Sequence, residues 1–341
     1  MKPSLLLPIS MLLLLFSCKK GETGKGDPAV TQYEVKTYYS NTTGIIMSGM
    51  YGICAVENAT GLDYLLVVDP VTQIVYKITG PDKAEIFVEL PSPQNNLVWD
   101  ITTDGANHFI TTGGSGIIKT DYTKNLQYLS GYNQSGTAVE GPPESVRFRD
   151  PRGICYSGGA VYITDMETHL VQQVSAQTGY CNLFAGRVGV SGGNEDGDQG
   201  TARFIAPMSI CENPKGGFFV GQEAAIRKIS NGFVKISTLA GGSLGYRDGQ
   251  GTAAAFDMVT GMCADKDGNL YVADYSNCCI RKIDEEGNVT TFAGLGDDCG
   301  YADGDTNEAK FYFPYDICLD SKGNFYVTDH GNKKIRIIKP K

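Results

Sequence analysis

The sequence predicts an all-β protein, a six-bladed β-propeller whose blades have four strands each. The first observation is a motif, Gly-Ile-Cys or a variant of it, whose third residue stands at positions 54, 102, 155, 211, 263 and 318. The second is the glycine content, 43 of 341 residues, which is typical of a chain with many tight turns. Units of about 50 residues that read as four short strands are typical of propeller blades.

The fifth unit shows the strand pattern most clearly. After the motif strand at Gly261-Met262-Cys263, the turn Asp267-Gly268-Asn269 has the composition of a hairpin. Aromatic and β-branched residues at 270–273, 279–283 and 288–293 predict three more strands. Six such units predict six blades, at about 46–94, 95–147, 148–203, 204–255, 256–310 and 311–341 plus 30–45.

The same unit resembles the NHL repeat. It carries that repeat's Gly-Asn-hydrophobic-Tyr-Val-x-Asp element at 268–274 and its Asn-x-x-Ile-Arg-Lys-Ile element at 277–283. Blades three, four and six match well, whereas blades one and two are degenerate. The resemblance covers roughly residues 30–341 and implies a propeller.

The last repeat stops after its third strand, at 334–338, whereas the segment 33–39 has strand character and belongs to no blade. We therefore predict that the N-terminal strand completes the last blade. This arrangement would close the ring and cover two sheet edges.

The N-terminus reads as an export signal. An apolar run at 5–16 is too short to span a bilayer and suits the core of a signal peptide. The run ends at Ser17-Cys18, which resembles the lipobox of bacterial lipoproteins; the alternative is an ordinary signal peptide with an incidental Cys18. We expect a signal peptide at 1–17, a flexible tether at 18–29, and a lipid anchor on Cys18 in the outer membrane, because Lys19 is not the aspartate of an inner-membrane signal.

The charge balance bears on the partners. Formal net charge is −9 and the chain has no basic cluster, which argues against nucleic acid. Some animal NHL proteins bind RNA, but they present basic surfaces. No second apolar run is long enough to span a membrane, so contact with the membrane is expected only through the lipid anchor, for a monomeric propeller.

The ten cysteines fall into distinct groups. Five occupy one equivalent position on the innermost strands, where only a small apolar side chain fits; they are Cys54, Cys155, Cys211, Cys263 and Cys318. Cys278 and Cys299 stand at adjacent strand ends of one blade and are candidates for a disulfide. No Cys-x-x-Cys or Cys/His cluster with metal-ligand spacing occurs.

Other polar residues are better explained by structure than by chemistry. Asp69, Asp165, Asp274 and Asp329 end second strands, where they are expected to cap turns, with metal ligation as the alternative. The three histidines are His108, His169 and His330. They lie at unrelated repeat positions, so neither a three-histidine metal site nor a Ser-His-Asp set is predicted.

The residues just before the motif strands are the candidate binding site, at the mouth of the channel. This position holds Tyr51, Trp99, Arg152, Met208, Thr260 and Tyr315, and the next holds Gly52, Asp100, Gly153, Ser209, Gly261 and Asp316. Aromatic rings, a guanidinium and two carboxylates in one concavity suit a sugar or a peptide. The alternative is that these side chains only plug the channel.

Two functional hypotheses follow. The first is a non-catalytic propeller of the cell envelope that binds a glycan, a peptide or an envelope protein and needs no cofactor. The second is a calcium-dependent enzyme, because six-bladed relatives include calcium-dependent lactonases and lyases. In this sequence only Asp100 and Asp316 stand at the mouth, whereas those families use a fuller set of oxygen ligands.

Overall fold

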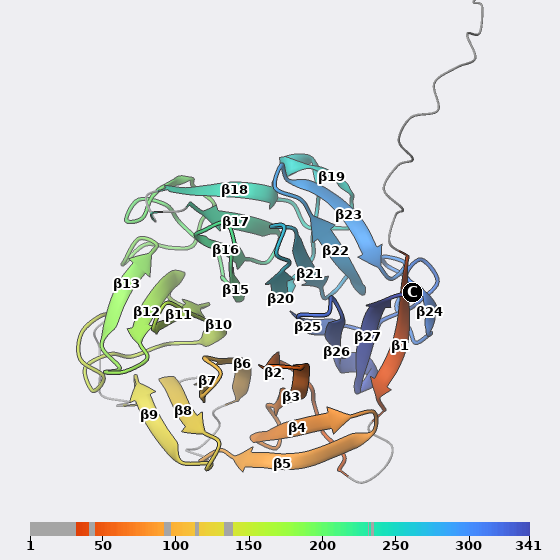
Figure 1. The fold of residues 1–341 in the computed structure, drawn as a ribbon. Coiled ribbons are helices and arrows are strands. Elements are labelled where there is room, and N and C mark those ends of the chain that lie inside the picture. The colour runs from red at the N-terminus through yellow and green to blue at the C-terminus, as the bar shows by residue number, and fades with distance from the viewer. Residues whose placement is uncertain are drawn as a thin grey trace, which may run out of the picture. The chain divides into compact units, whose positions relative to one another are not determined.

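Six antiparallel sheets surround a common centre and form the blades of a propeller (Figure 1). The structure, a computed structural model, describes residues 32–40, 45–91, 97–112, 116–132, 139–230, 232 and 235–341. The predicted signal peptide, Cys18 and the tether lie outside the described residues. The predicted fold class, an all-β six-bladed propeller with four-stranded blades, is confirmed.

Each blade follows the chain outward from the centre of the ring. Blade 1 contains β2 (Ile53–Asn58), β3 (Gly61–Asp69), β4 (Ile74–Gly80) and β5 (Lys83–Glu89). Blade 2 contains β6 (Val98–Thr103), β7 (Asn107–Thr112), β8 (Gly116–Asp121) and β9 (Leu126–Ser130). Blade 3 contains β10 (Pro151–Ser157), β11 (Ala160–Asp165), β12 (Leu170–Ser175) and β13 (Cys181–Ala185).

The second half of the ring follows the same plan. Blade 4 contains β15 (Ser209–Glu212), β16 (Phe218–Gly221), β17 (Ala225–Ile229) and β18 (Lys235–Gly241). Blade 5 contains β20 (Val259–Ala264), β21 (Leu270–Asp274), β22 (Cys279–Ile283) and β23 (Asn288–Ala293). Blade 6 contains β25 (Pro314–Leu319), β26 (Phe325–Asp329) and β27 (Lys334–Pro340). Two 3-10 helices, η1 (Gly251–Ala253) and η2 (His330–Asn332), lie in connections.

The N-terminal strand β1 (Tyr33–Tyr39) supplies the fourth strand of blade 6, as the sequence predicts. It pairs antiparallel with β27, from Tyr33 opposite Pro340 to Tyr39 opposite Ile335. The first and last strands of the propeller therefore lie side by side (Figure 1). This pairing closes the ring without leaving β27 as a free edge.

Three blades gain a short fifth strand from the loop of the preceding blade. β14 (Gly197–Asp198) pairs with β18, β19 (Gly249–Gln250) with β23, and β24 (Gly304–Asp305) with β1. These strands come from the glycine-rich segments that the sequence predicts to be inter-blade loops. The loops thus connect the blades and also cover their outer edges.

The core consists of apolar clusters between neighbouring blades. Among the described residues, one cluster fills each of the six inter-blade spaces. The second strands of blades 3 to 6 (β11, β16, β21 and β26) are buried along their whole length, because blades pack on both of their faces. This explains their continuous runs of apolar residues.

Cys278 and Cys299 form a disulfide in the structure, with 5.3 Å between their Cα atoms. The link joins the turn before β22 to the loop after β23. A second check concerns membranes: within the described ranges, no helix has the length and apolar character needed to cross a bilayer.

Candidate functional site

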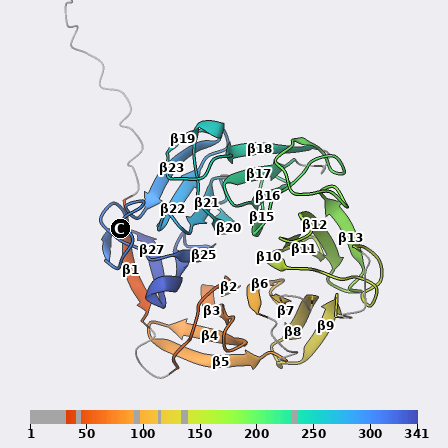
Figure 2. The ribbon, with the colours of Figure 1, turned by 180° about the vertical axis from the view of Figure 1, so that it is seen from behind.

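The predicted mouth residues lie at the start of the innermost strands. Trp99 belongs to β6, Arg152 to β10 and Tyr315 to β25, whereas Tyr51 directly precedes β2. Each of these strands contacts the innermost strand of the next blade. Seen from either side, they surround the centre of the ring (Figures 1 and 2). The repeat therefore brings one side chain from each blade to the same end of the channel.

Three aromatic rings stack at this mouth. The Tyr51 ring lies between Tyr315, at a centroid distance of 4.0 Å, and Trp99, at 5.5 Å. Arg152 continues the stack, with its guanidinium carbon 3.5 Å from the centre of the Trp99 ring. Both a nitrogen of the fork and Nε of Arg152 donate to Asp150, which fixes the guanidinium in place. A cation over an indole face is favourable, so the stack is well ordered.

The stack extends into a larger aromatic cluster that the sequence analysis did not predict. Tyr275 lies 6.1 Å from Tyr315, and Phe313 stacks on Tyr275 at 4.9 Å and on Tyr312 at 4.4 Å. His330 packs edge-on against Tyr51 at 4.9 Å. We call Tyr51, Trp99, Tyr275, Tyr312, Phe313, Tyr315 and His330 the aromatic cluster.

A signal in the sequence could have revealed these additions. Tyr275 and His330 come directly after second strands, and the loops after second strands lie on the same face as the mouth. The cluster spans blades 5, 6, 1 and 2. Met208 and Thr260 occupy the equivalent position on blades 4 and 5, and the Thr260 hydroxyl donates to the Tyr315 carbonyl. The aromatic surface therefore lies on one side of the mouth.

The two predicted carboxylates lie one residue below the aromatic stack and join adjacent blades. Asp100 accepts hydrogen bonds from the backbone N–H groups of Ile101 and Ile154, the latter in blade 3. Asp316 accepts from Ile317 and from Ile53, which lies in blade 1. Both carboxylates thus bridge to the following blade.

Burial opposes the negative charge on this pair. It raises the pKa of Asp100 from its ordinary value near 3.8 to about 7, although two N–H groups donate to it. Burial, and then the neighbouring charge of Asp100, raise the pKa of Asp316 well above its ordinary value. The pair therefore holds a proton at pH values where exposed carboxyl groups are ionised.

This raised pKa makes a testable contribution to stability. The folded state holds the Asp100 proton more tightly than the unfolded chain, so the contribution is full below about pH 4 and is lost as pH rises towards 7. The free energy of unfolding of the wild type, minus that of Asp100→Asn, should therefore decrease between pH 4 and pH 7. Urea unfolding at a series of pH values measures it. A difference that is constant or grows with pH would contradict the assignment.

The strand-end aspartates have a structural role. Asp69 accepts from the backbone N–H groups of Ser48 and Val71, and Asp165 from those of Arg149 and Asp150. These contacts match the predicted turn caps.

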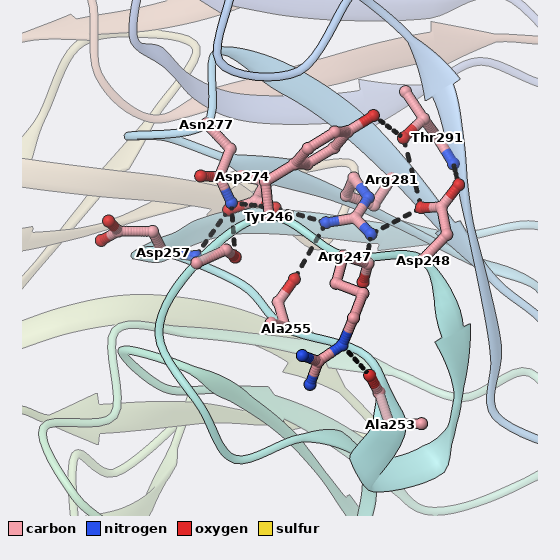
Figure 3. A network of polar contacts seen from close by, with 11 residues as sticks. Tyr246, Arg247, Asp248, Ala253, Ala255, Asp257, Asp274, Asn277, Arg281 and Thr291 are labelled. Atoms are coloured by element: carbon pink, nitrogen blue, oxygen red, sulfur yellow. Dashed lines mark hydrogen bonds and ion pairs between the residues drawn. The ribbon is translucent and has the colours of Figure 1, made fainter.

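In blades 5 and 6 the same aspartates also bind a buried arginine, which the sequence analysis did not predict. Arg281 Nη1 lies 2.7 Å from Asp274, and its Nη2 lies 2.6 Å from Asp248, in the loop of the preceding blade (Figure 3). Arg336 makes the equivalent pairs with Asp329 and Asp303. These networks join each blade to the one before it.

The remaining histidines lie away from the mouth. His169 accepts a hydrogen bond from the Ala206 N–H through Nδ1, and His108 packs edge-on against Phe87 and Tyr122. Burial lowers the pKa of His108 to about 4. In the part of the chain that the structure describes, no group of three or more histidine, cysteine or acidic side chains is arranged to hold a metal ion.

The five equivalent cysteines pack against the inter-blade clusters, as predicted, and remain free thiols. They also line a cavity of about 310 Å³ within the channel, which the sequence analysis did not predict. Burial raises the pKa of these thiols, that of Cys155 to about 12. They are therefore neutral at physiological pH.

Comparison with known proteins places the repeats in a family. The segments 148–174, 256–283 and 311–338 match the NHL repeat. They correspond to the first three strands of blades 3, 5 and 6. The chain thus contains NHL repeats, as the resemblance implied.

A human relative shares the repeats over most of this chain. NHL repeat-containing protein 2 of Homo sapiens is 28% identical over 331 residues, which cover 82% of this chain and 44% of the human protein. The chain therefore spans less than half the length of that relative.

Solved structures show the same fold. An auxiliary nutrient binding protein from Bacteroides ovatus superposes with a TM-score of 0.67 at 17% identity, covering 92% of this chain and 78% of the other. A virginiamycin B lyase from Staphylococcus aureus superposes with a TM-score of 0.55 at 13% identity, covering 90% and 99%. At these identities the likeness concerns the fold alone.

Proposed function

We propose that this six-bladed propeller with NHL repeats is a non-catalytic binding protein of the cell envelope, and that it takes a glycan or a peptide at the aromatic cluster. In this proposal Cys18 carries the lipid that anchors it to the outer membrane. The observation that carries the binding role is the aromatic cluster itself. The likeness to an auxiliary nutrient binding propeller supports it.

The surface chemistry of the cluster suits such a ligand. Tyr312 is 41% exposed, and Tyr51, Tyr275 and Tyr315 are half-buried, so ring surface is held rigidly and remains accessible. Aromatic rings offer apolar faces to a sugar ring or a side chain, and tyrosine hydroxyls add hydrogen bonds at their edges. Rigid aromatic groups lose little conformational entropy on binding, which favours affinity.

Trp99 provides a direct reporter of binding, because it is the single tryptophan of the chain. We expect its fluorescence to change in a saturable way when the correct oligosaccharide or peptide is titrated. Tyr275→Ala and Tyr315→Ala should each weaken binding by about tenfold, equivalent to about 1.4 kcal/mol, and both variants keep Trp99. Isothermal calorimetry with panels of soluble oligosaccharides and of short peptides gives the affinities.

The matched control is Tyr128→Ala. Tyr128 is 40% exposed but lies on β9, the outermost strand of blade 2. Its removal should leave the affinity unchanged. A ligand that binds by calorimetry, leaves the Trp99 emission unchanged and is insensitive to Tyr275→Ala and Tyr315→Ala would place binding elsewhere.

A further inference from the structure

The channel cavity lies below the aromatic cluster and has a polar end. Asp100, Asp316 and Ser209 line it at the level just below the stacked rings. The other lining residues lie further along the innermost strands, away from the mouth, and include Ala55 and Ala264. The cavity is therefore distinct from the proposed binding surface.

The three polar groups come from alternate blades. At their shared repeat position, blades 2, 4 and 6 carry Asp100, Ser209 and Asp316, and blades 1, 3 and 5 carry Gly52, Gly153 and Gly261. The glycines are needed because a Cβ atom on Gly52 would lie 2.5 Å from the Asp100 Cα, with equivalent clashes at the other two. Alternate blades of a six-bladed ring are about a third of a turn apart. The three polar groups thus surround the axis with approximately threefold spacing.

Each polar group keeps the capacity to accept a further hydrogen bond. A carboxylate has about four acceptor positions, and each of the two carboxylates accepts two backbone N–H groups. The Ser209 hydroxyl donates to the Val259 carbonyl, which leaves its oxygen lone pairs available. Three acceptors therefore converge at one end of the cavity.

The walls of the cavity are narrow and uncharged. Neutral thiols of Cys54, Cys155, Cys211, Cys263 and Cys318 line it, with Thr102 at the equivalent position of blade 2. Small side chains at this level leave room for a slender apolar body but provide no cation to balance the carboxylates. The raised pKa of Asp100 is consistent with that missing counter-charge.

We propose that this cavity binds the primary ammonium group of a slender ligand. An R–NH₃⁺ group has three N–H donors in threefold arrangement about its axis, which matches the three acceptors on blades 2, 4 and 6. Its positive charge compensates the two carboxylates, and its alkyl stem lies along the thiols. A hard divalent cation prefers six or more oxygen ligands, which two carboxylates and one hydroxyl do not supply.

Calorimetry with isosteric probes tests this on the wild-type protein. We expect n-butylammonium to bind about tenfold more tightly than the neutral 1-butanol, and butyrate not to bind. Nα-acetyl-lysine amide, compared with n-butylammonium, distinguishes a lysine side chain of a peptide from a free small amine. Equal affinity for butylammonium and butanol, or no binding of any amine, would overturn the proposal.

Variants locate the binding site. Asp100→Asn and Asp316→Asn should each weaken butylammonium binding by about tenfold, and Ser209→Ala by a smaller factor. Asp63→Asn, which removes an equal charge at an exposed position of β3, should have no effect. Because the two aspartates also join blades, Ser209→Ala and the wild-type probe series decide the question if an aspartate variant does not fold. Binding unchanged in folded variants at all three positions would overturn the assignment to this cavity.

Discussion

Replacing Arg281 with methionine is expected to lower the free energy of unfolding by about 3–5 kcal/mol. The Arg281 side chain is completely buried and donates to Asp274, to Asp248 and to the carbonyls of Ala255 and Arg247 (Figure 3). Methionine fills similar volume but leaves the Asp274 carboxylate, also completely buried, without its cation. An uncompensated buried charge is much more costly than the loss of an exposed ion pair.

Two comparisons separate this effect from the general cost of a substitution. Arg187→Met, at an exposed position, should change stability by less than about 0.5 kcal/mol. Arg227→Met should cost less than Arg281→Met, because Arg227 has the neutral Gln222 where Arg281 has an aspartate. Urea unfolding followed by circular dichroism gives all three values. An Arg281→Met loss equal to that of Arg187→Met would show that the ion pairs contribute nothing net.

Deletion of residues 33–39 is expected to abolish cooperative folding of the whole propeller. Val35 and Tyr39 of β1 are buried in the two apolar clusters that flank blade 6. Each buried side chain of this size contributes about 1.5–3 kcal/mol, and β1 also provides the ladder that covers β27 and holds β24. Domains are stable by only about 5–15 kcal/mol, so the combined loss exceeds what the ring can tolerate.

A trimmed control and a rescue make this test decisive. Removal of residues 19–31, which precede β1, should leave the melting temperature unchanged. A synthetic peptide of residues 32–40 should restore the fold of the 33–39 deletion in a saturable way, because it can add as the missing strand. A deletion variant with the wild-type melting temperature would show that ring closure does not depend on β1.

Much of the fold could be predicted because each blade repeats one local pattern. The Gly-Ile-Cys frame gave the blade number, and the missing strand of the last repeat together with the unassigned strand at 33–39 gave the closure. The partners of Arg281 could not be derived in the same way. Asp248 lies 33 residues earlier, in the loop of another blade, so the contact depends on how blades pack. Arginine at the same position in blades 4, 5 and 6 was the available signal.

The candidate site was predictable in position but not in detail. The repeat correctly brings Tyr51, Trp99 and Tyr315 to one end of the channel, yet nothing in the spacing determines that their rings stack on one another. The cysteines are a second case. Their small size predicts packing, but whether the space beside them is filled depends on the ring diameter, which the six blades determine together.

The alternation of glycine with a larger residue around the axis limits the number of blades. Each glycine on an odd blade accommodates the close approach of the next strand, and each larger residue on an even blade reaches forward to the blade after it. Such a pattern closes on itself only when the number of blades is even. Gain or loss of one blade would place two glycines, or two bulky neighbours, next to each other. A ring of this kind can therefore grow or shrink only by pairs of blades.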